Sequence, residues 1–132
     1  MTTIRIAAAL LVGKDDRLLV RKRGTRAFMQ PGGKIEPDEL PVAALVRELH
    51  EELGLLVSSA SAVHVGSFRA PAAHEPDCTV EAEVFRVVVS EDVTPAAEID
   101  EIAWIDAAMP PDLLMAPLTR DHIIPLHRSF GR

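Results

Sequence analysis

Hydrophobic and polar positions follow a strand-like pattern in most of the chain. Apolar runs at residues 4–12 and 18–20 flank a short polar stretch, which predicts a β-hairpin. Alternation of apolar and polar residues returns at 63–68 and 79–89, and a shorter apolar run follows at 102–105. We therefore expect a strand in each of these segments.

One segment, residues 40–53, has a helical period instead. Its apolar residues recur at i, i+3, i+4, i+7 and i+11 and form a stripe roughly 100° wide. The stripe consists of Val42, Leu45, Val46, Leu49 and Leu53. Pro41 suits a first helical turn, and Gly54 is typical of the residue that ends a helix. Residues 30–33 have loop composition, and 113–118 suggest a second helix. This order of strands and helices predicts an α/β fold with a mixed sheet.

Composition narrows the class of protein. At 132 residues, the chain is expected to be one domain, spanning 1–132. The net charge of −6 disfavours a long nucleic-acid partner, because phosphate neutralisation needs clustered lysine and arginine. The single cysteine, Cys78, excludes an intrachain disulfide. The apolar run 4–12 is about half the length of a spanning helix, so we expect no membrane partner and a cytoplasmic location.

Three glutamates share one arc of the predicted helix. Glu48, Glu51 and Glu52 fall within roughly 100° of one another, beside the apolar stripe. Like charges at these spacings destabilise a helix by a few tenths of a kcal/mol per pair, and a hard divalent cation would reverse that effect. The alternative is an acidic helix face exposed to solvent, on which an Arg47–Glu51 ion pair reduces the repulsion between the glutamates. We expect the carboxylates to face away from the stripe, so that replacing them leaves the fold intact.

The residues before and within this helix have a fixed spacing. Five residues separate Gly33 from Glu39, and seven more precede the run at 47–55. The fixed positions are Gly33, Glu39, Arg47, Glu48, Leu49, Glu51, Glu52, Gly54 and Leu55. This spacing resembles the Nudix box, G-x5-E-x7-R-E-U-x-E-E-x-G-U, where U is a bulky aliphatic residue, and it matches at every fixed position. Segments on both sides of the box resemble the same family.

The resemblance implies an α/β/α sandwich and hydrolysis of a nucleoside diphosphate linked to another group, with Mg²⁺ or Mn²⁺ as cofactor. Metal ions neutralise a pyrophosphate and activate water. By the same resemblance, Glu48 and Glu52 are metal ligands, and the Gly33 carbonyl is another. Glu51 is a further ligand or the general base, with Glu48 as the other candidate for the base. Arg47 is expected to orient a glutamate through a charge-assisted hydrogen bond.

Residues outside the helix complete the expected site. Relatives that cleave nucleoside triphosphates place a phosphate-binding arginine where Arg23 stands. Lys34, next to the glycines, is a second expected contact to substrate. Many family members carry an extra metal-binding or base glutamate near Glu98, with Glu101 as the competing position. A solvated surface side chain remains the alternative for each of them.

Two loops supply further candidates. Phe28, in the loop before the glycines, is the aromatic residue best placed to stack on a base, with core packing as the alternative. His74 and Glu75 lie in a proline-flanked loop, and Glu75 is expected to bind substrate.

The resemblance does not determine which group is linked to the nucleoside diphosphate, and so it does not determine the substrate. The short chain and the segment 23–33 resemble MutT-type nucleoside triphosphate pyrophosphohydrolases, which clean nucleotide pools. ADP-ribose or a nucleotide sugar is the alternative, because Pro71 lies where relatives that cleave ADP-ribose tend to carry a proline. A Nudix-fold binding module without catalysis is a third hypothesis. The partner is thus expected to be a small nucleotide, and a homodimer is a further hypothesis.

Overall fold

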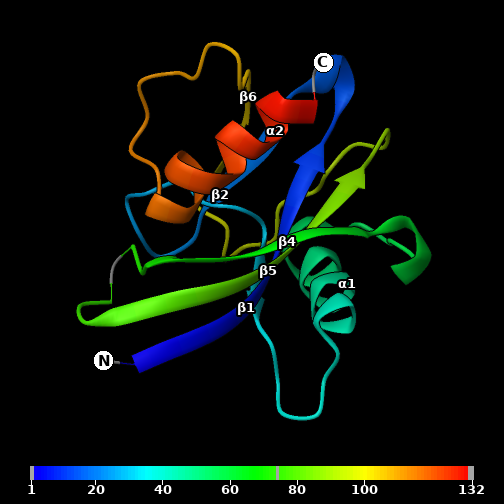
Figure 1. Cartoon of the computed structure of the whole chain (residues 1–132). Helices are drawn as coiled ribbons and strands as arrows, with labels where there is room; N and C mark the ends of the chain where they lie inside the picture. The colour runs from blue at the N-terminus through cyan, green and yellow to red at the C-terminus, as the bar shows by residue number, and fades with distance from the viewer. Residues whose placement is uncertain (1, 74, 131–132) are drawn as a thin grey trace.

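A mixed β-sheet lies at the centre of the molecule (Figure 1). The computed structural model describes residues 2–73 and 75–130, and within them six strands form one sheet in the order β4-β5-β1-β2-β6, with β3 paired to β1. The strands are β1 (Thr2–Val12), β2 (Leu18–Lys22), β3 (Gly32–Lys34), β4 (Val63–Pro71), β5 (Cys78–Val88) and β6 (Glu101–Ile105). The helices are α1 (Pro41–Leu53) and α2 (Ile124–Phe130), the latter entered through a π-helical turn at Thr119–Ile123. Short 3₁₀ turns occupy Lys14–Asp16 and Ser59–Ser61. The strands expected from alternation are all present.

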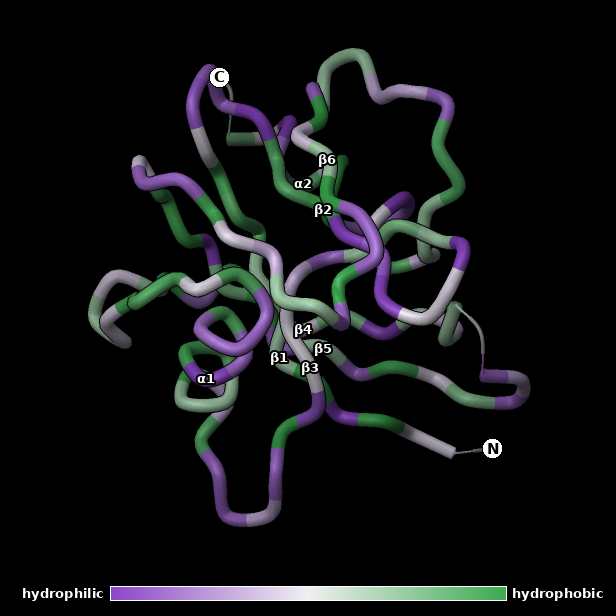
Figure 2. Tube along the Cα trace, turned by 180° about the vertical axis from the view of Figure 1, so that it is seen from behind, coloured by the Kyte–Doolittle hydropathy of each residue, from purple (hydrophilic) through white to green (hydrophobic). Residues whose placement is uncertain are grey.

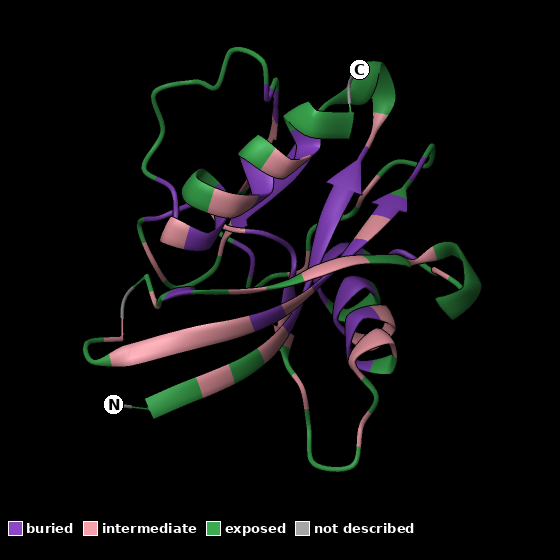
Figure 3. Cartoon of the chain, in the orientation of Figure 1, coloured by how far each residue is buried: buried purple, intermediate pink, exposed green. Residues whose placement is uncertain are grey.

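Strand β1 is buried on both faces along its C-terminal half (Figure 3). Ala8 and Leu10 point into one apolar cluster, which includes residues of the C-terminal helical segment. Ala7 and Ala9 point into the other cluster, which includes the apolar stripe of α1. Because successive side chains of a strand face opposite ways, a continuous apolar run can serve two layers at once. The fold is therefore the expected α/β sandwich, with helices on opposite sides of a mixed sheet.

Helix α1 confirms the prediction made for residues 40–53. Pro41 occupies its first turn, where a missing N–H costs nothing. Leu45, Leu49 and Leu53 are fully buried against the sheet. Gly54 ends the helix in the left-handed conformation, with φ of 68°, and its N–H donates to the His50 carbonyl at 3.0 Å. A hydrophilic connection links β3 to the start of this helix (Figure 2).

Two local predictions are only partly correct. Residues 113–116 are not helical and pair with Phe28 instead, whereas the C-terminal helical segment begins at Pro117, whose missing N–H falls in the first turn. The Phe28 N–H donates to the Leu114 carbonyl and the Ala116 N–H donates to the Phe28 carbonyl, each at 2.8 Å. The supposed loop at 30–33 ends in strand β3, whose Gly33 pairs with Ala7 of β1.

No helix within residues 2–73 and 75–130 is long and apolar enough to cross a membrane.

Candidate active site

Arg21 and Glu52 form a buried ion pair that joins β2 to α1. Arg21 Nε donates to Glu52 Oε1 at 3.0 Å, and its Nη2 donates to Oε2 at 2.9 Å. The two side chains are only 6% and 2% exposed. Arg21 reaches the helix because it lies two residues after Leu19, which packs in the cluster under α1. The last turn of α1 is thereby held against the sheet by a two-point, charge-assisted contact.

The same pair holds strand β3 beside the helix. Arg21 Nη2 also donates to the Gly32 carbonyl at 2.9 Å, and the Gly32 N–H donates to Glu52 Oε1 at 3.3 Å. Gly32 has φ of +142°, and a Cβ there would collide with the Ala7 carbonyl. Only glycine fits this position.

Glu48 lies one turn earlier on α1 and is also buried, at 8% exposure. Its Oε2 accepts a hydrogen bond from Arg47 Nη1 at 2.8 Å. Its Oε1 is buried without a hydrogen-bond partner among the residues that the structure describes. Burial raises the pKa of Glu48 above its usual value, and the hydrogen bond from Arg47 opposes that rise. A Cβ on Gly33 would come within 2.6 Å of the Glu48 carboxyl carbon, so the missing side chain makes room for this carboxylate.

Arg47 ties the β3–α1 connection to the helix. Its Nε and Nη2 donate to the two carboxylate oxygens of Glu39 at 3.0 and 2.9 Å, and Nη2 also donates to the Lys34 carbonyl at 3.2 Å. The hydrogen bond from Arg47 is the main cause that lowers the pKa of Glu39 to about 2. The same bond raises the pKa of Arg47 further above its usual value. Arg47 thus orients Glu48 while its other donors fix the loop.

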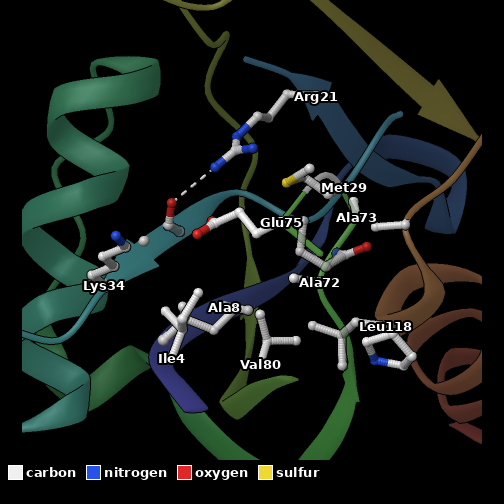
Figure 4. Close-up of a pocket in the computed structure, with 16 residues that line it drawn as sticks. Ile4, Ala8, Arg21, Met29, Lys34, Ala72, Ala73, Glu75, Val80 and Leu118 are labelled. Carbon is white, nitrogen blue, oxygen red and sulfur yellow. Dashed lines mark hydrogen bonds between the residues drawn. The ribbon is translucent and has the colours of Figure 1, made fainter. Parts of the chain in front are cut away.

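A cavity of about 150 Å³ opens beside β3. Gly33, Lys34 and Glu75 line it, together with Arg21 and the buried Gln30. Figure 4 shows apolar side chains along one side of this cavity and the labelled charged side chains along the other. The strand that passes Glu48 therefore also forms a wall of the cavity.

The expected site residues do not all gather here. Arg23 comes near, with its Nη1 3.4 Å from Glu52 Oε2 and 4.0 Å from Glu48 Oε1. Glu51 points outward, with its side chain 57% exposed. Glu98 is exposed on the loop after β5, with no hydrogen bond or ion pair to the helix carboxylates in the described part of the chain.

The site predictions made for Phe28 and for the loop at 74–75 compare differently with the structure. Phe28 is 4% exposed in the core cluster and does not line the cavity, so the structure does not bring it to the site as a base-stacking residue. Lys22 Nζ lies 5.0 Å from the centre of its ring. Glu75 lines the cavity as expected, whereas His74 lies outside the described residues.

The described residues suit a divalent cation in their chemistry but are not arranged around one. No group of three or more His, Cys, Asp or Glu side chains within 2–73 and 75–130 is placed to hold a metal ion. Glu48 and Glu52 instead pair with Arg47 and Arg21. The fit lies in Glu48, whose buried Oε1 is a hard oxygen donor without a hydrogen-bond partner among the described residues. A cation would offset the cost of its desolvation. Glu52 and the Gly33 carbonyl are the neighbouring oxygen donors.

Two residues of this region escaped the sequence analysis. Arg21 looked like a strand-end charge, yet the parity of β2 places it on the same face as Leu19, and that signal was readable. Gln30 looked like part of a loop, and nothing in its local sequence shows that it would be buried against β1. Its Nε2 donates to the Ala9 carbonyl at 2.8 Å.

A family model of the NUDIX domain matches residues 1–126. Among curated proteins, the chain is similar to the 8-oxo-dGTP diphosphatase of Escherichia coli K12, at 37% identity over 60 residues, covering 42% of this chain and 46% of that protein. It is also similar to the CTP pyrophosphohydrolase of the same organism, at 40% identity over 60 residues, covering 42% of this chain and 44% of that protein. The chain thus matches about half the length of these relatives.

Solved structures have the same fold. The MutT protein of Methanosarcina mazei superposes with a TM-score of 0.77 at 22% identity, covering 99% of this chain and 96% of that one. The ORF135 protein of E. coli superposes with a TM-score of 0.72 at 25% identity, covering 99% of this chain and 90% of that one.

Proposed function

The chain belongs to the NUDIX family, and from this premise we propose that it hydrolyses a pyrophosphate bond of a nucleoside triphosphate with the help of a divalent cation. The observation that carries the proposal is the buried Glu48 Oε1, which has no hydrogen-bond partner among the described residues and lies beside Gly33, a residue that also lines a cavity large enough for part of a nucleotide. The named activities of the partial relatives, on 8-oxo-dGTP and CTP, support the choice of a triphosphate.

In this proposal each side chain has a definite task. Glu48, Glu52 and the Gly33 carbonyl would hold Mg²⁺, or Mn²⁺ in its place. When bound, the cation neutralises phosphate charge and lowers the pKa of water. Arg47 fixes the rotamer of Glu48, and Arg21 fixes that of Glu52.

The exposed, positively charged side chains at the site are the proposed phosphate-binding groups. Arg23 is half exposed beside both carboxylates, and Lys34 is exposed at the end of β3. Lys34 can turn toward a phosphate freely, whereas Arg23 would exchange its long hydrogen bond to Glu52 Oε2, at 3.4 Å, for a phosphate oxygen. Glu48 and Glu51 remain the two candidates for the group that accepts the proton of water.

A product-release screen with Mg²⁺ tests this proposal. Its panel holds ordinary and oxidised deoxynucleoside triphosphates, CTP, ADP-ribose, nucleotide sugars and dinucleoside polyphosphates. Pyrophosphate from a triphosphate, lost on removal of the metal, is the expected result. AMP from ADP-ribose with every triphosphate intact would contradict the proposed substrate and favour the alternative carried by the loop at 71–75. Nucleotide binding without any turnover would instead indicate a binding module.

A further inference from the structure

Arg23 stands where β2 ends and an irregular loop begins. The strand extends to Lys22, and residues 23–27 form successive bends rather than a helix or strand. Ordering a loop when a ligand binds costs free energy, so a phosphate-binding side chain on such a loop works best when its backbone is already held in place. A role in holding Arg23 rests on the proposed function, in which this arginine binds a phosphate.

Asp100 holds both peptide groups that flank Arg23. Its N–H donates to the Lys22 carbonyl at 2.9 Å, which continues the antiparallel pairing of β2 with β6 (Figure 1). Its side-chain Oδ2 accepts a hydrogen bond from the Gly24 N–H, also at 2.9 Å. A peptide group is planar, so the φ and ψ angles of Arg23 are the two soft rotations between these fixed groups. One aspartate therefore fixes the direction in which the arginine leaves the chain.

The segment that contains Asp100 is itself anchored on α1. The Ala96 N–H donates to the backbone carbonyl of Glu52 at 2.8 Å. The last carbonyls of a helix have no partner within the helix, and this bond satisfies one of them. Ile99 is buried directly before Asp100. Residues 96–100 thus connect the backbone of a proposed metal ligand to the backbone around Arg23.

The side chain of Arg23 lies where this connection would be useful. Its Nη1 is 3.4 Å from Glu52 Oε2 and 4.0 Å from Glu48 Oε1. The side chain is 46% exposed, so the guanidinium can move from Glu52 to a phosphate while the backbone stays in place. Only side-chain rotamers then have to be ordered when the phosphate binds, which reduces the entropic cost of binding.

We propose that Asp100 is a positioning residue for the phosphate chain of the substrate. Its carboxylate holds the Gly24 N–H so that Arg23 directs its guanidinium to the phosphates beside Glu52. Asp100 acts as a hydrogen-bond acceptor in this role, and an asparagine amide oxygen at the same place can accept the same bond. Asp100→Asn should therefore preserve the function that Asp100→Ala removes.

Binding of the α,β-methylene analogues of CTP and dGTP tests the proposal without turnover. Isothermal titration with Mg²⁺ uses whichever analogue the wild type binds more tightly. Asp100→Ala should weaken binding at least about fivefold, and Asp100→Asn should stay within about twofold of the wild type. In steady-state hydrolysis of the matching triphosphate, Asp100→Ala should raise KM by a similar factor and change kcat less than about twofold, because binding is lost equally in the ground and transition states.

Asp106→Ala is the matched control. Asp106 directly follows β6, as Asp100 directly precedes it, and its Oδ1 accepts the Ala108 N–H at 2.9 Å. This variant loses the same kind of hydrogen bond at the far end of the strand and should bind the analogue like the wild type. Thermal melts accompany every variant. Asp100→Glu, which moves the acceptor by one methylene, should show the same loss and replaces Asp100→Ala if the alanine variant does not fold.

A double-mutant cycle with Arg23→Ala separates positioning from a general effect on the fold. In the Arg23→Ala background, Asp100→Ala should change the affinity less than about twofold, because the side chain that it positions is gone. Losses that simply add would overturn the proposal, as would wild-type affinity in Asp100→Ala or in Arg23→Ala. An equal loss in Asp106→Ala, or a loss in Asp100→Asn as large as in Asp100→Ala, would also overturn it.

The same experiments distinguish this proposal from the proposed reaction. Coupling between Asp100 and Arg23 in analogue binding, without hydrolysis of a triphosphate, refutes the reaction alone. Hydrolysis by the wild type, with unchanged affinity in Asp100→Ala, refutes the positioning role alone. A wild type that neither binds the analogues nor hydrolyses the triphosphates refutes both.

Discussion

The guanidinium of Arg21 donates to both carboxylate oxygens of Glu52, and this pair lies buried between β2 and α1. Glu52 is a fixed position of the NUDIX box, so a strand residue outside the box determines how one of its carboxylates is oriented. Replacing one partner of a buried pair leaves an uncompensated charge, which is far more costly than removing both.

Arg21→Met should therefore lower the free energy of unfolding by about 3–5 kcal/mol. Arg23, whose Nη1 lies 3.4 Å from Glu52 Oε2, compensates part of this loss. Urea denaturation measures the difference. The double variant Arg21→Met/Glu52→Leu is the matched control and should recover most of the stability. A single variant as stable as the wild type would show that the Arg21–Glu52 pair does not stabilise the fold. The sequence led us to expect that replacing any of the three helix carboxylates would leave the fold intact. Because Glu52 is buried in an ion pair with Arg21, replacing Glu52 alone should instead destabilise the fold.

Glu48→Gln should lower turnover at least about tenfold, equivalent to about 1.4 kcal/mol of transition-state stabilisation. The fold should persist, because an amide oxygen can still accept the hydrogen bond from Arg47. Steady-state kinetics with a circular dichroism control measures both. Glu51→Gln in the same assays separates the candidates for the base, since the base is the residue whose loss slows turnover without weakening Mn²⁺ binding. Wild-type turnover in Glu48→Gln would exclude the proposed metal site.

Mn²⁺ should raise the melting temperature of the wild type and leave that of Glu48→Gln unchanged. A cation that binds only the folded state stabilises it by an amount that grows with the logarithm of the cation concentration above Kd. Differential scanning fluorimetry across a Mn²⁺ titration measures the shift. An equal shift in both proteins would place the cation elsewhere.

Replacing the neighbouring glycines Gly32 and Gly33 by alanine should have different effects. Gly32→Ala should destabilise the fold, because φ of +142° and the nearby Ala7 carbonyl leave no room for a side chain. Gly33→Ala should mainly impair activity, because its Cβ would displace the Glu48 carboxylate from 2.6 Å away. Melting temperature and kcat, measured for both variants, distinguish the two effects. Loss of activity at full metal affinity in Gly33→Ala would count against the proposed role of Glu48 as a metal ligand, because Glu48 is the side chain that the new Cβ displaces.

Glu39→Gln should show a pH-dependent stability deficit. The pKa of Glu39 is lowered from 4.5 to about 2 in the folded protein, so the ionised form is bound more favourably there than in the unfolded chain. This contribution is fully present above about pH 4.5 and is lost as the pH falls toward 2. Urea midpoints of wild type and variant should therefore differ at pH 7 and converge as the pH falls to 3 and below. A constant difference would show that the Arg47–Glu39 pair stabilises by packing rather than by charge.

Local patterns predicted local structure well. The period of the leucines in residues 40–53 predicted helix α1, and Gly54 predicted where that helix ends. The spacing from Gly33 to Leu55 identifies the family from the sequence alone. These features depend on neighbours within a few residues, which the chain order displays directly.

Contacts between distant segments were not predictable in the same way. Glu48 and Glu52 are buried because Arg47 and Arg21 pair with them, and the helical wheel alone could not distinguish this arrangement from a solvated face. Phe28 became a core residue because the chain near Met115 folds back over it. Gln30 is buried and donates to the Ala9 carbonyl, a contact that forms only when β1 and the 30–33 segment meet.

The parallel pairing of β1 with β5 joins Thr2 to Cys78 and Val12 to Val88. A ribosome releases the first strand long before its central partner exists, so the nascent chain holds an aliphatic strand with one side unpaired. Closing so long a loop costs entropy before any parallel contact repays it, and contacts of this separation slow folding. Pairing of this open side of β1 must therefore await synthesis of β5, and the nascent chain is exposed to misfolding until then.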